Sequence, residues 1–328
     1  MRAPEYWIKG SQSVLPTILT PFSMLYALID GINRKMTNTR SVDIPVVCIG
    51  NIVAGGAGKT PVAIEIARFL IHSGWSVHFL SRGYGGKEKG PLCVSLDVHR
   101  AEDVGDEPLI LASVAPTWIA SDRYAGATKA VEAGADIILM DDGFQNRSLK
   151  KDLSLLVIDA GYGIGNGRLL PAGPLRETVA SALQRTDGVI VVGEKTDFSF
   201  LKGVSVPVFS ARIVPHALQK ELVGEKVVAF AGIGRPQKFF DSLIDAGAEV
   251  IEALEFPDHY SFKRDDIMKL VEKAALHNAA LVTTRKDYVR LSDEARMMTT
   301  VFDIDLMFEQ PDRLQQLLKG ITGSREHA

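Results

Sequence analysis

Residues 50–61, GNIVAGGAGKTP, constrain the fold of this chain more than any other stretch. A loop that wraps a polyphosphate needs open backbone N–H groups, an ammonium group and a hydroxyl group that can bind Mg²⁺. Lys59 supplies the ammonium group and Thr60 the hydroxyl group. The open backbone comes from Gly55, Gly56 and Gly58, and Ala57 is a further expected nucleotide-binding position of the loop. The usual phosphate-loop pattern has a glycine where this chain has Val53, so the match fails at that position.

The flanking residues support a nucleotide-binding loop. Residues 44–49, IPVVCI, are a short apolar run of strand type, and PVAIEIARFLI from Pro61 has apolar residues at helical spacing. A strand, a glycine-rich loop and a helix in this order point the N-terminus of the helix at an anion. The alternative is a flexible turn in which the GKT triplet is incidental.

Short apolar runs and helical patterns alternate after Asp43. The expected strands are 44–49, 77–81, 118–121, 136–140, 155–159 and 189–193, and the expected helices are 59–72, 106–114, 122–133 and 174–185. This alternation predicts an α/β domain of the P-loop NTPase type, with a mainly parallel sheet and ligands at the carboxyl ends of its strands.

A second, smaller α/β domain is expected near the C-terminus. Its expected strands are 227–234, 249–256 and 280–284, and helices are expected at 236–246, 264–276 and 310–319. The runs 206–214 and 301–309 bracket it and could pair as a two-stranded ribbon, which would make the boundary a hinge. The predicted division is an N-terminal segment 1–36, a phosphate-loop domain 37–212 to which a helix within 308–328 could return, and a smaller domain 213–307.

The composition excludes some classes of function. A length of 328 residues is enough for two domains. The net charge of −3 gives no electrostatic reason to expect binding to nucleic acid. Cys48 and Cys93 are the only cysteines, which fits a reducing compartment better than a disulfide framework. Nothing in the sequence indicates an obligatory protein partner.

Residues 10–29, GSQSVLPTILTPFSMLYALI, contain no charged side chain. A stretch of about 20 residues has the length of a membrane span. However, Pro16, Pro21 and several hydroxyl side chains lower its hydrophobicity. The pattern favours a helix that lies at a membrane interface over a buried packing helix, and favours both over a true span. An anchor of this kind would place the substrate in the membrane.

Carboxylates occur at two expected strand or helix ends. In DIILMDDGFQN (136–146) a hydrophobic strand ends in Asp141 and Asp142, which is the Walker-B arrangement for holding Mg²⁺. Adjacent side chains of an extended chain point to opposite sides, so one of the two is expected to face the metal directly. In VGDEP (104–108), Asp106 could orient or deprotonate an acceptor hydroxyl group, although acids in a first helical turn are also ordinary dipole complements.

Three further loops carry polar side chains. His259 lies beside Asp258 in FPDHYSF, a loop after a strand of the smaller domain, where closure could bring it over the first domain. The Gly- and Pro-rich loop GNGRLLPAGPLRE (165–177) enters the expected helix at Pro174, and an arginine there such as Arg176 could clamp a phosphate. The turn SRGYGG (81–86) offers Tyr84.

Together these segments resemble the tetraacyldisaccharide 4′-kinases. The matching segments, in order, are GNIVAGGAGKTP, SRGYGG, VGDEP, DDGFQN, GNGRLLPAGPLRE, AGIGRPQKFF, FPDHYSF and TTRKDY. The resemblance covers nearly the whole chain as far as about Tyr288, and the family also lacks the first glycine of the loop pattern. It implies two α/β domains joined by a ribbon hinge. It also implies transfer of the γ-phosphate of ATP, with Mg²⁺, to the 4′-hydroxyl of a tetraacylated glucosamine disaccharide 1-phosphate, forming lipid IVA.

The resemblance also implies a location and residue roles. Such kinases sit on the cytoplasmic face of the bacterial inner membrane, with the lipid surface as a partner. The implied roles are phosphate and Mg²⁺ binding by Lys59 and Thr60, a metal site with Asp141, Asp142 and Glu177, catalysis by Asp106 with His259 as its partner, and nucleotide-site positions for Tyr84 and Arg176. The chain departs from the family at Asn146, where His is more frequent, and at Arg285, where Glu is expected.

Two other classes of function stay open at this point. One is a different P-loop enzyme, such as an ATP-dependent ligase or a kinase of a soluble metabolite, against which the uncharged N-terminus argues. The other is a membrane-attached nucleotide switch that recruits a partner protein. A switch would need no acid that orients a hydroxyl group, so Asp106 and His259 distinguish it from a kinase.

Overall fold

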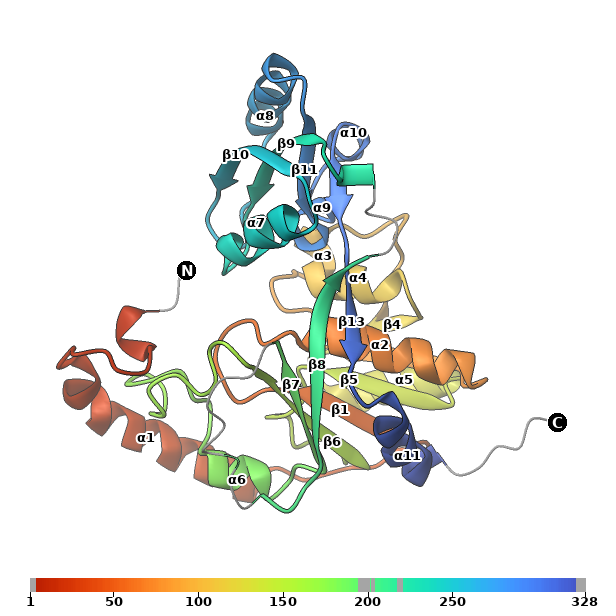
Figure 1. Ribbon diagram of the computed structural model, residues 1–328. Helices are drawn as coiled ribbons and strands as arrows, with labels where there is room; N and C mark the ends of the chain where they lie inside the picture. Colours follow the sequence, from red (N-terminus) through yellow and green to blue (C-terminus); the bar gives the residue numbers. More distant parts are fainter. Residues whose placement is uncertain (1–3, 194–200, 202–203, 217–220, 323–328) are drawn as a thin grey trace.

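The computed structural model describes residues 4–193, 201, 204–216 and 221–322. The chain forms two β-sheets (Figure 1). We call the nine-stranded sheet with its helices the large unit, and the four-stranded sheet with its helices the small unit. The large sheet has the strand order β13-β8-β7-β6-β1-β5-β2-β4-β3 and the small sheet the order β10-β9-β11-β12.

The large sheet contains β1 (Val46–Gly50), β2 (Val77–Ser81), β3 (Leu92–Cys93), β4 (Thr117–Ile119), β5 (Ile137–Asp141), β6 (Leu153–Asp159), β7 (Gly188–Val192), β8 (Val208–Pro215) and β13 (Ile304–Phe308). The helices of the large unit are α2 (Lys59–His72), α3 (Ala101–Val104), α4 (Asp106–Ala112), α5 (Arg123–Glu132), α6 (Val179–Leu183) and α11 (Pro311–Thr322). The small unit contains β9 (Lys226–Ala231), α7 (Pro236–Asp245), β10 (Glu249–Glu255), α8 (Arg264–Leu276), β11 (Ala280–Thr284), α9 (Arg285–Tyr288), α10 (Asp293–Met297) and β12 (Thr300–Phe302).

The predicted mainly parallel α/β sheet is confirmed. β1 pairs in parallel with β5 on one side and with β6 on the other, so the carboxyl ends of three strands meet at the phosphate loop. Successive residues of β1 face opposite sides of the sheet. Val47 and Ile49 pack in the core formed with α2 and α11, whereas Val46 and Cys48 pack in the core formed with α5 and α6. The C-terminal helix therefore covers the large sheet.

The predicted pairing between the two runs that bracket the small unit is present. The first residues of β8, Val208 to Ala211, pair with β7, and its end, Ala211 to Pro215, pairs in antiparallel fashion with β13. The run expected as one strand over 301–309 is divided at Asp303 into β12, which belongs to the small sheet, and β13, which belongs to the large one. Two chain connections therefore join the large unit to the small unit, and they lie side by side (Figure 1).

The helix expected over 174–185 is wrong in its first part, because α6 begins only at Val179. Residues 174–176 pair with the phosphate loop instead. The Ala54 N–H donates to the Pro174 carbonyl at 2.8 Å, and the Arg176 N–H donates to the Ile52 carbonyl at 2.7 Å. These backbone bonds to a distant segment outweigh the local helical pattern.

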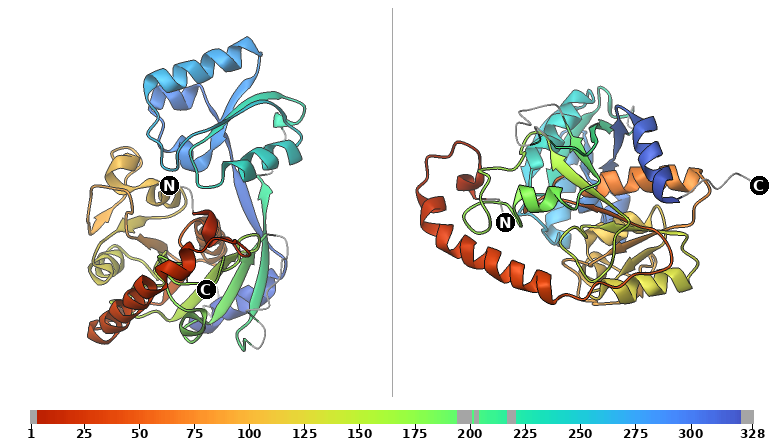
Figure 2. Two further views of the ribbon diagram at one scale, coloured as in Figure 1. Left: turned by 90° about the vertical axis from the view of Figure 1, so that its left-hand side faces the viewer. Right: turned by 90° about the horizontal axis from the view of Figure 1, so that it is seen from below.

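The uncharged N-terminal stretch forms part of α1 (Leu15–Met36), which lies at the periphery of the large unit (Figure 2). Its window Leu15–Asn33 is long and apolar enough to cross a membrane and is only 11% buried. One side is held by polar contacts: the Ser23 hydroxyl donates to the Leu169 carbonyl at 2.9 Å, and Arg168 donates to the Thr20 hydroxyl at 2.9 Å. The exposed apolar side chains of α1 are Leu15, Ile18, Phe22, Met24, Leu25, Leu28, Ile29, Ile32 and Met36.

Candidate active site

The phosphate loop connects β1 to α2 and is held open by its own backbone and by the segment beside it. Gly55 and Gly58 have φ angles of 122° and 80°, which glycine adopts without strain. The Asn51 amide group donates to the Val53 carbonyl at 2.9 Å and to the Gly55 carbonyl at 3.3 Å. Val53 is buried and forms a β-bridge with Leu175, which accounts for an apolar residue where the common motif has glycine.

Lys59 begins α2, and its ammonium group is buried beneath the loop. Its Nζ lies 3.4 Å from Asp142 Oδ1 and donates to Asn51 Oδ1 at 3.4 Å. Arg176 donates to the same Asp142 oxygen at 3.1 Å. Burial alone would raise the pKa of Asp142, but the charges of Lys59 and Arg176 hold it below its usual range. Asp142 is therefore an anchored carboxylate, in a left-handed backbone conformation with φ 51°.

Asp141 faces the other way, toward Thr60. The Thr60 hydroxyl donates to Asp141 Oδ2 at 3.5 Å, whereas Asp141 Oδ1 is buried and has no hydrogen-bond partner among the described residues. Burial and, next, the charge of the neighbouring Glu107 raise the pKa of Asp141, and the charge of Lys59 offsets this only in part. A buried oxygen without a donor beside a threonine hydroxyl fits a Mg²⁺ ligand pair of the P-loop type. In the described part of the chain, no group of three or more His, Cys, Asp or Glu side chains is arranged to hold a metal ion.

A second polar cluster joins the two units next to the phosphate loop. Asp106 begins α4 in the large unit, and His259 lies in the loop after β10 in the small unit. His259 Nδ1 donates to Asp106 Oδ2 at 2.9 Å, and Arg290, which follows α9, donates to the same oxygen. Lys286 on α9 pairs with Glu107 at 2.8 Å. Burial alone would raise the pKa of Asp106, but hydrogen bonds from His259 and Arg290 hold it well below its usual range.

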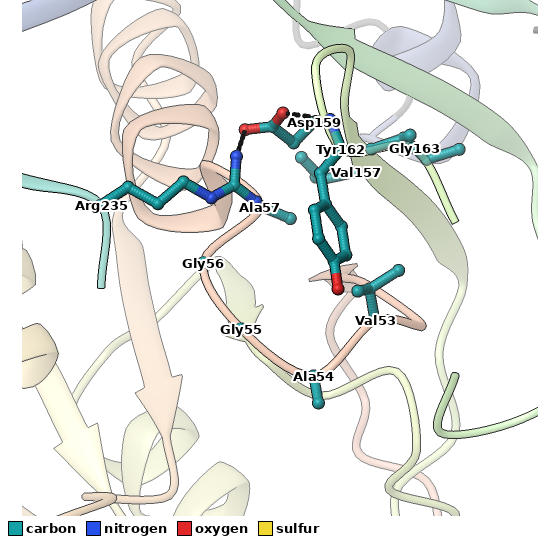
Figure 3. A pocket seen from close by; sticks show the side chains of 11 residues that line it. Val53, Ala54, Gly55, Gly56, Ala57, Val157, Asp159, Tyr162, Gly163 and Arg235 are labelled. Atoms are coloured by element: carbon teal, nitrogen blue, oxygen red, sulfur yellow. Dashed lines mark hydrogen bonds and ion pairs between the residues drawn. The ribbon is translucent and has the colours of Figure 1, made fainter. Parts of the chain in front are cut away.

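A second contact between the units lies on the opposite side of the loop. Asp159 ends β6 and accepts hydrogen bonds from Arg235 at 3.0 Å and from Lys238 at 2.9 Å, both at the start of α7. Arg235 also lies over the ring of Tyr162, with 4.9 Å from its Cζ atom to the ring centroid. Figure 3 shows Asp159, Tyr162 and Arg235 at a small pocket that is also lined by phosphate-loop residues 53–57. On both sides of the loop the small unit supplies the cations and the large unit the carboxylates.

Two of the remaining expected residues reach the site in different ways. Tyr84 is 71% exposed, and its ring lies 6.3 Å from that of His259 in an edge-on arrangement. Glu177 is buried and pairs with Arg185 at 2.6 Å while accepting from Gln145 at 3.3 Å. Gln145 in turn donates to the Asn51 carbonyl at 2.8 Å. Glu177 thus supports the loop through Gln145, and its expected role as a metal ligand stays a prediction.

The two positions that depart from the family pattern have structural contacts. Asn146 Oδ1 accepts from the Leu149 N–H at 3.3 Å in the turn after the acidic pair. Arg285 forms an ion pair with Asp303, the residue between β12 and β13. Neither contact involves the phosphate loop.

Sequence reasoning missed three charged side chains of the site, Glu107, Lys286 and Arg290. Glu107 follows Asp106 directly, and Lys286 lies in the TTRKDY segment, so motif membership was the available signal for both. Arg290 lies beyond that segment, and its contact with Asp106 joins residues 184 positions apart. A charged side chain in a helical stretch usually indicates a solvated face, so the neighbouring sequence did not indicate that Arg290 is buried at the site.

The known proteins that match this chain agree with the geometry. The family model for tetraacyldisaccharide-1-P 4′-kinase matches residues 15–322. The chain is 46% identical to the tetraacyldisaccharide 4′-kinase of Paramagnetospirillum magneticum over 98% of this chain and 99% of the relative. It is 44% identical to that of Rhodospirillum centenum over 99% of this chain and 98% of the relative.

A solved structure matches over the same extent. The "apo" form of LpxK from Aquifex aeolicus in complex with ATP has a TM-score of 0.76 and 27% identity, covering 94% of this chain and 99% of that one. The family match runs from the start of α1 to the end of α11 and so includes both sheets and every residue of the site. The chain therefore belongs to the tetraacyldisaccharide 4′-kinase family.

Proposed function

We propose that this chain transfers the γ-phosphate of ATP to the 4′-hydroxyl of a tetraacylated glucosamine disaccharide 1-phosphate, with the residue roles given below. One observation carries the assignment of roles: a phosphate-binding loop and a buried carboxylate that can accept a proton lie at the same edge of the sheet. Burial alone would raise the pKa of Glu107, the neighbour of Asp106, but Lys286 and, next, the phosphate-loop Lys59 lower it.

The phosphate loop binds ATP. Its backbone N–H groups surround the polyphosphate, and Lys59 neutralises charge on the β- and γ-phosphates. Thr60 and Asp141 would hold Mg²⁺, which when bound neutralises further charge on the same oxygens. Asp142 holds Lys59 and Arg176 in place, since its carboxylate contacts both. The unpartnered oxygen of Asp141 supports this division of the acidic pair.

Asp106 accepts the proton of the 4′-hydroxyl group as the 4′ oxygen attacks the γ phosphorus. The bond from the γ phosphorus to the bridging oxygen breaks, and ADP leaves with its electron pair. His259 holds Asp106 through the 2.9 Å hydrogen bond. Losing a positioned base typically lowers the rate by roughly 10²–10⁴-fold.

We infer further that α1 lies on the cytoplasmic face of the bacterial inner membrane and holds the chain against the lipid surface that contains the substrate. Its exposed apolar side chains would enter the interface, and the polar contacts of Ser23 and Thr20 keep one side on the protein. A helix that is docked along one side in this way is better suited to lie on a bilayer than to cross it.

The two units are, in this proposal, domains that open and close around the substrates. We propose that one domain consists of residues 37–212 with the returning C-terminal helix, and the other of residues 213–307. The ribbon of β8 and β13 then lies at the boundary between them. The ribbon would act as the hinge, because closure needs two strands to bend rather than a large interface to slide.

Mass spectrometry of the lipid tests this function. The purified protein is incubated with ATP, Mg²⁺ and a tetraacyldisaccharide 1-phosphate in detergent micelles. We expect a product heavier by one phosphoryl group with the wild-type protein and none with Lys59→Ala. ATP hydrolysis without any change in lipid mass would instead indicate a nucleotide switch or a different acceptor.

A further inference from the structure

Arg290 occupies the centre of the contact between the two units. Its side chain is only 5% exposed, and it lies between Asp106 of the large unit and Asp287 of α9, whose side chains are 9% and 0% exposed. Nη2 donates to Asp106 Oδ2, whereas Nη1 donates to Asp287 Oδ1 at 2.9 Å and to the Gly232 carbonyl at 2.9 Å. A planar guanidinium group held at three acceptors has a fixed orientation.

The same acceptors fix the loop that carries His259. The His259 N–H donates to the Gly232 carbonyl at 3.1 Å, which is also an acceptor for Arg290. The Gly232 N–H donates to Asp287 Oδ2 at 3.0 Å. His259 itself has φ 59°, a left-handed conformation that a non-glycine residue keeps only when its surroundings hold it. Arg290 and His259 are therefore one preformed assembly of the small unit.

Both members of this assembly contact the same oxygen of Asp106. The hydrogen bonds from His259 Nδ1 and Arg290 Nη2 both end on Oδ2. None of the contacts described for Asp106 ends on Oδ1. A carboxylate with one oxygen fixed by two donors keeps a defined orientation for the other oxygen, which is then the atom left to accept a proton.

We propose that Arg290 is a positioning residue for phosphoryl transfer: by holding Oδ2 of Asp106 it directs Oδ1 toward the acceptor hydroxyl group, and it does so only when the two units are in contact. This inference rests on the proposed role of Asp106 as the base. In this proposal, closure of the two units is the step that orients Asp106 as the base, because both donors to Oδ2 come from the small unit.

The charges around Asp106 support the assignment. The charged and titratable groups that act on Asp106 are His259, Arg290 and Lys286, together with Asp287. Its neighbour Glu107 pairs with Lys286, and Asp258 acts on Arg290. Burial alone would raise the pKa of Asp106, and the donors His259 and Arg290 more than offset that effect. Below its pKa the carboxyl group is protonated and cannot accept a proton. Removal of Arg290 raises this pKa and so moves the acid limb of kcat to higher pH.

The test compares the full-length wild type with Arg290→Gln, Arg290→Lys and the control Arg100→Gln. Arg100 forms another ion pair between the units, with Asp293 at 2.9 Å, but it is not a partner of Asp106. For each protein, kcat and the KM for ATP are measured with the lipid acceptor as a function of pH, and folding is checked by thermal melting.

We expect Arg290→Gln to lower kcat by about 10–10²-fold, the loss typical of a misplaced reacting group, with the KM for ATP unchanged and the acid limb moved to higher pH. Arg290→Lys keeps the charge and should restore the position of the acid limb but only part of kcat. Arg100→Gln should retain the wild-type profile.

Several outcomes would overturn the inference. One is an Arg290→Gln protein with the wild-type kcat and pH profile. Another is an equal loss in Arg290→Gln and Arg100→Gln without a shifted limb, which would mean that Arg290 only docks the units. If Arg290→Gln does not fold, a wild-type kcat in Arg290→Lys overturns it. A wild-type protein that leaves the lipid unphosphorylated would overturn the proposed function, and this inference with it.

Discussion

His259 Nδ1 lies 2.9 Å from Asp106 Oδ2, although 153 positions separate the two residues and they belong to different units. Neither unit alone contains this pair. The nucleotide loop, by contrast, is built entirely within the large unit. Nucleotide binding and acceptor activation therefore depend on different parts of the fold, and single substitutions can separate them.

Asp106→Asn keeps the shape of the side chain but removes its ability to accept a proton. We expect kcat for lipid phosphorylation to fall by roughly 10²–10⁴-fold, the usual contribution of a positioned base. ATP affinity, measured by equilibrium binding, should stay close to that of the wild type because Lys59 and Thr60 are untouched. An Asp106→Asn protein with wild-type turnover would remove Asp106 from the mechanism.

Leu25→Glu combined with Leu28→Glu places two charges on the exposed face of α1, where these side chains are 54% and 61% exposed. Apolar area that enters a lipid interface stabilises binding by about 25 cal/mol per Å². We therefore expect weaker co-sedimentation with anionic vesicles. The matched control is Leu276→Glu combined with Met297→Glu, since both residues are 83% exposed but lie on the small unit. Equal sedimentation of the α1 variant and the wild type would contradict the membrane role.

Asp159→Asn removes the carboxylate shared by Arg235 and Lys238. Burial alone would raise the pKa of Asp159, but Lys238 and Arg235 lower it overall, so its contribution to stability is present above the unfolded pKa of about 3.9. That contribution is lost as pH falls through the lowered folded pKa. The partners are 37% and 60% exposed, so we expect about 0.2–1 kcal/mol for each pair.

The measurement is thermal unfolding of the wild type and Asp159→Asn over a pH series. The wild type should melt at higher temperature near neutral pH, and the difference should shrink as the solution becomes acidic. A difference that does not depend on pH would mean that packing, and not charge, is responsible.

Gly50→Ala tests the close contact that ends β1. A Cβ atom at Gly50 would lie 2.5 Å from Phe144 Cβ and 3.0 Å from Phe144 N, and Phe144 is buried. Overpacking of this kind typically costs about 1–3 kcal/mol of unfolding free energy, measured by denaturant titration. Gly320→Ala in α11 is the control, because its Cβ meets nothing within 4 Å. The control should be neutral or slightly stabilising, and a stable Gly50→Ala protein would show that Phe144 can move.

The parts of the site that local sequence could predict are those whose partners lie on neighbouring strands. Lys59, Thr60, Asp141 and Asp142 follow from a strand, a glycine loop and a second strand ending in acids, because parallel strands bring their carboxyl ends together. The hydrogen bond from Arg290 to Asp106 could not be predicted in this way. Arg290 is 184 positions away, and its identity as a buried donor depends on how the small unit sits on the large one.

The error over residues 174–178 has a similar physical origin. Pro174 predicted the start of a helix, because proline is frequent at the first helical position, but the backbone of Leu175 and Arg176 pairs with Val53 and Ile52. A segment that serves as an edge for the phosphate loop cannot also close its own helical turns, and only the tertiary partner decides between them.

The distribution of charge across the contact between the units has a consequence for kinetics. Arg290 and Lys286 on one side of the phosphate loop, and Arg235 and Lys238 on the other, all face carboxylates of the large unit. In the opening and closing proposed above, opposite charges would attract over about a Debye length, roughly 8 Å at physiological ionic strength, and so before any hydrogen bond between the units can form. Added salt should therefore slow the closing step more than it weakens the closed form, in which these pairs are partly buried.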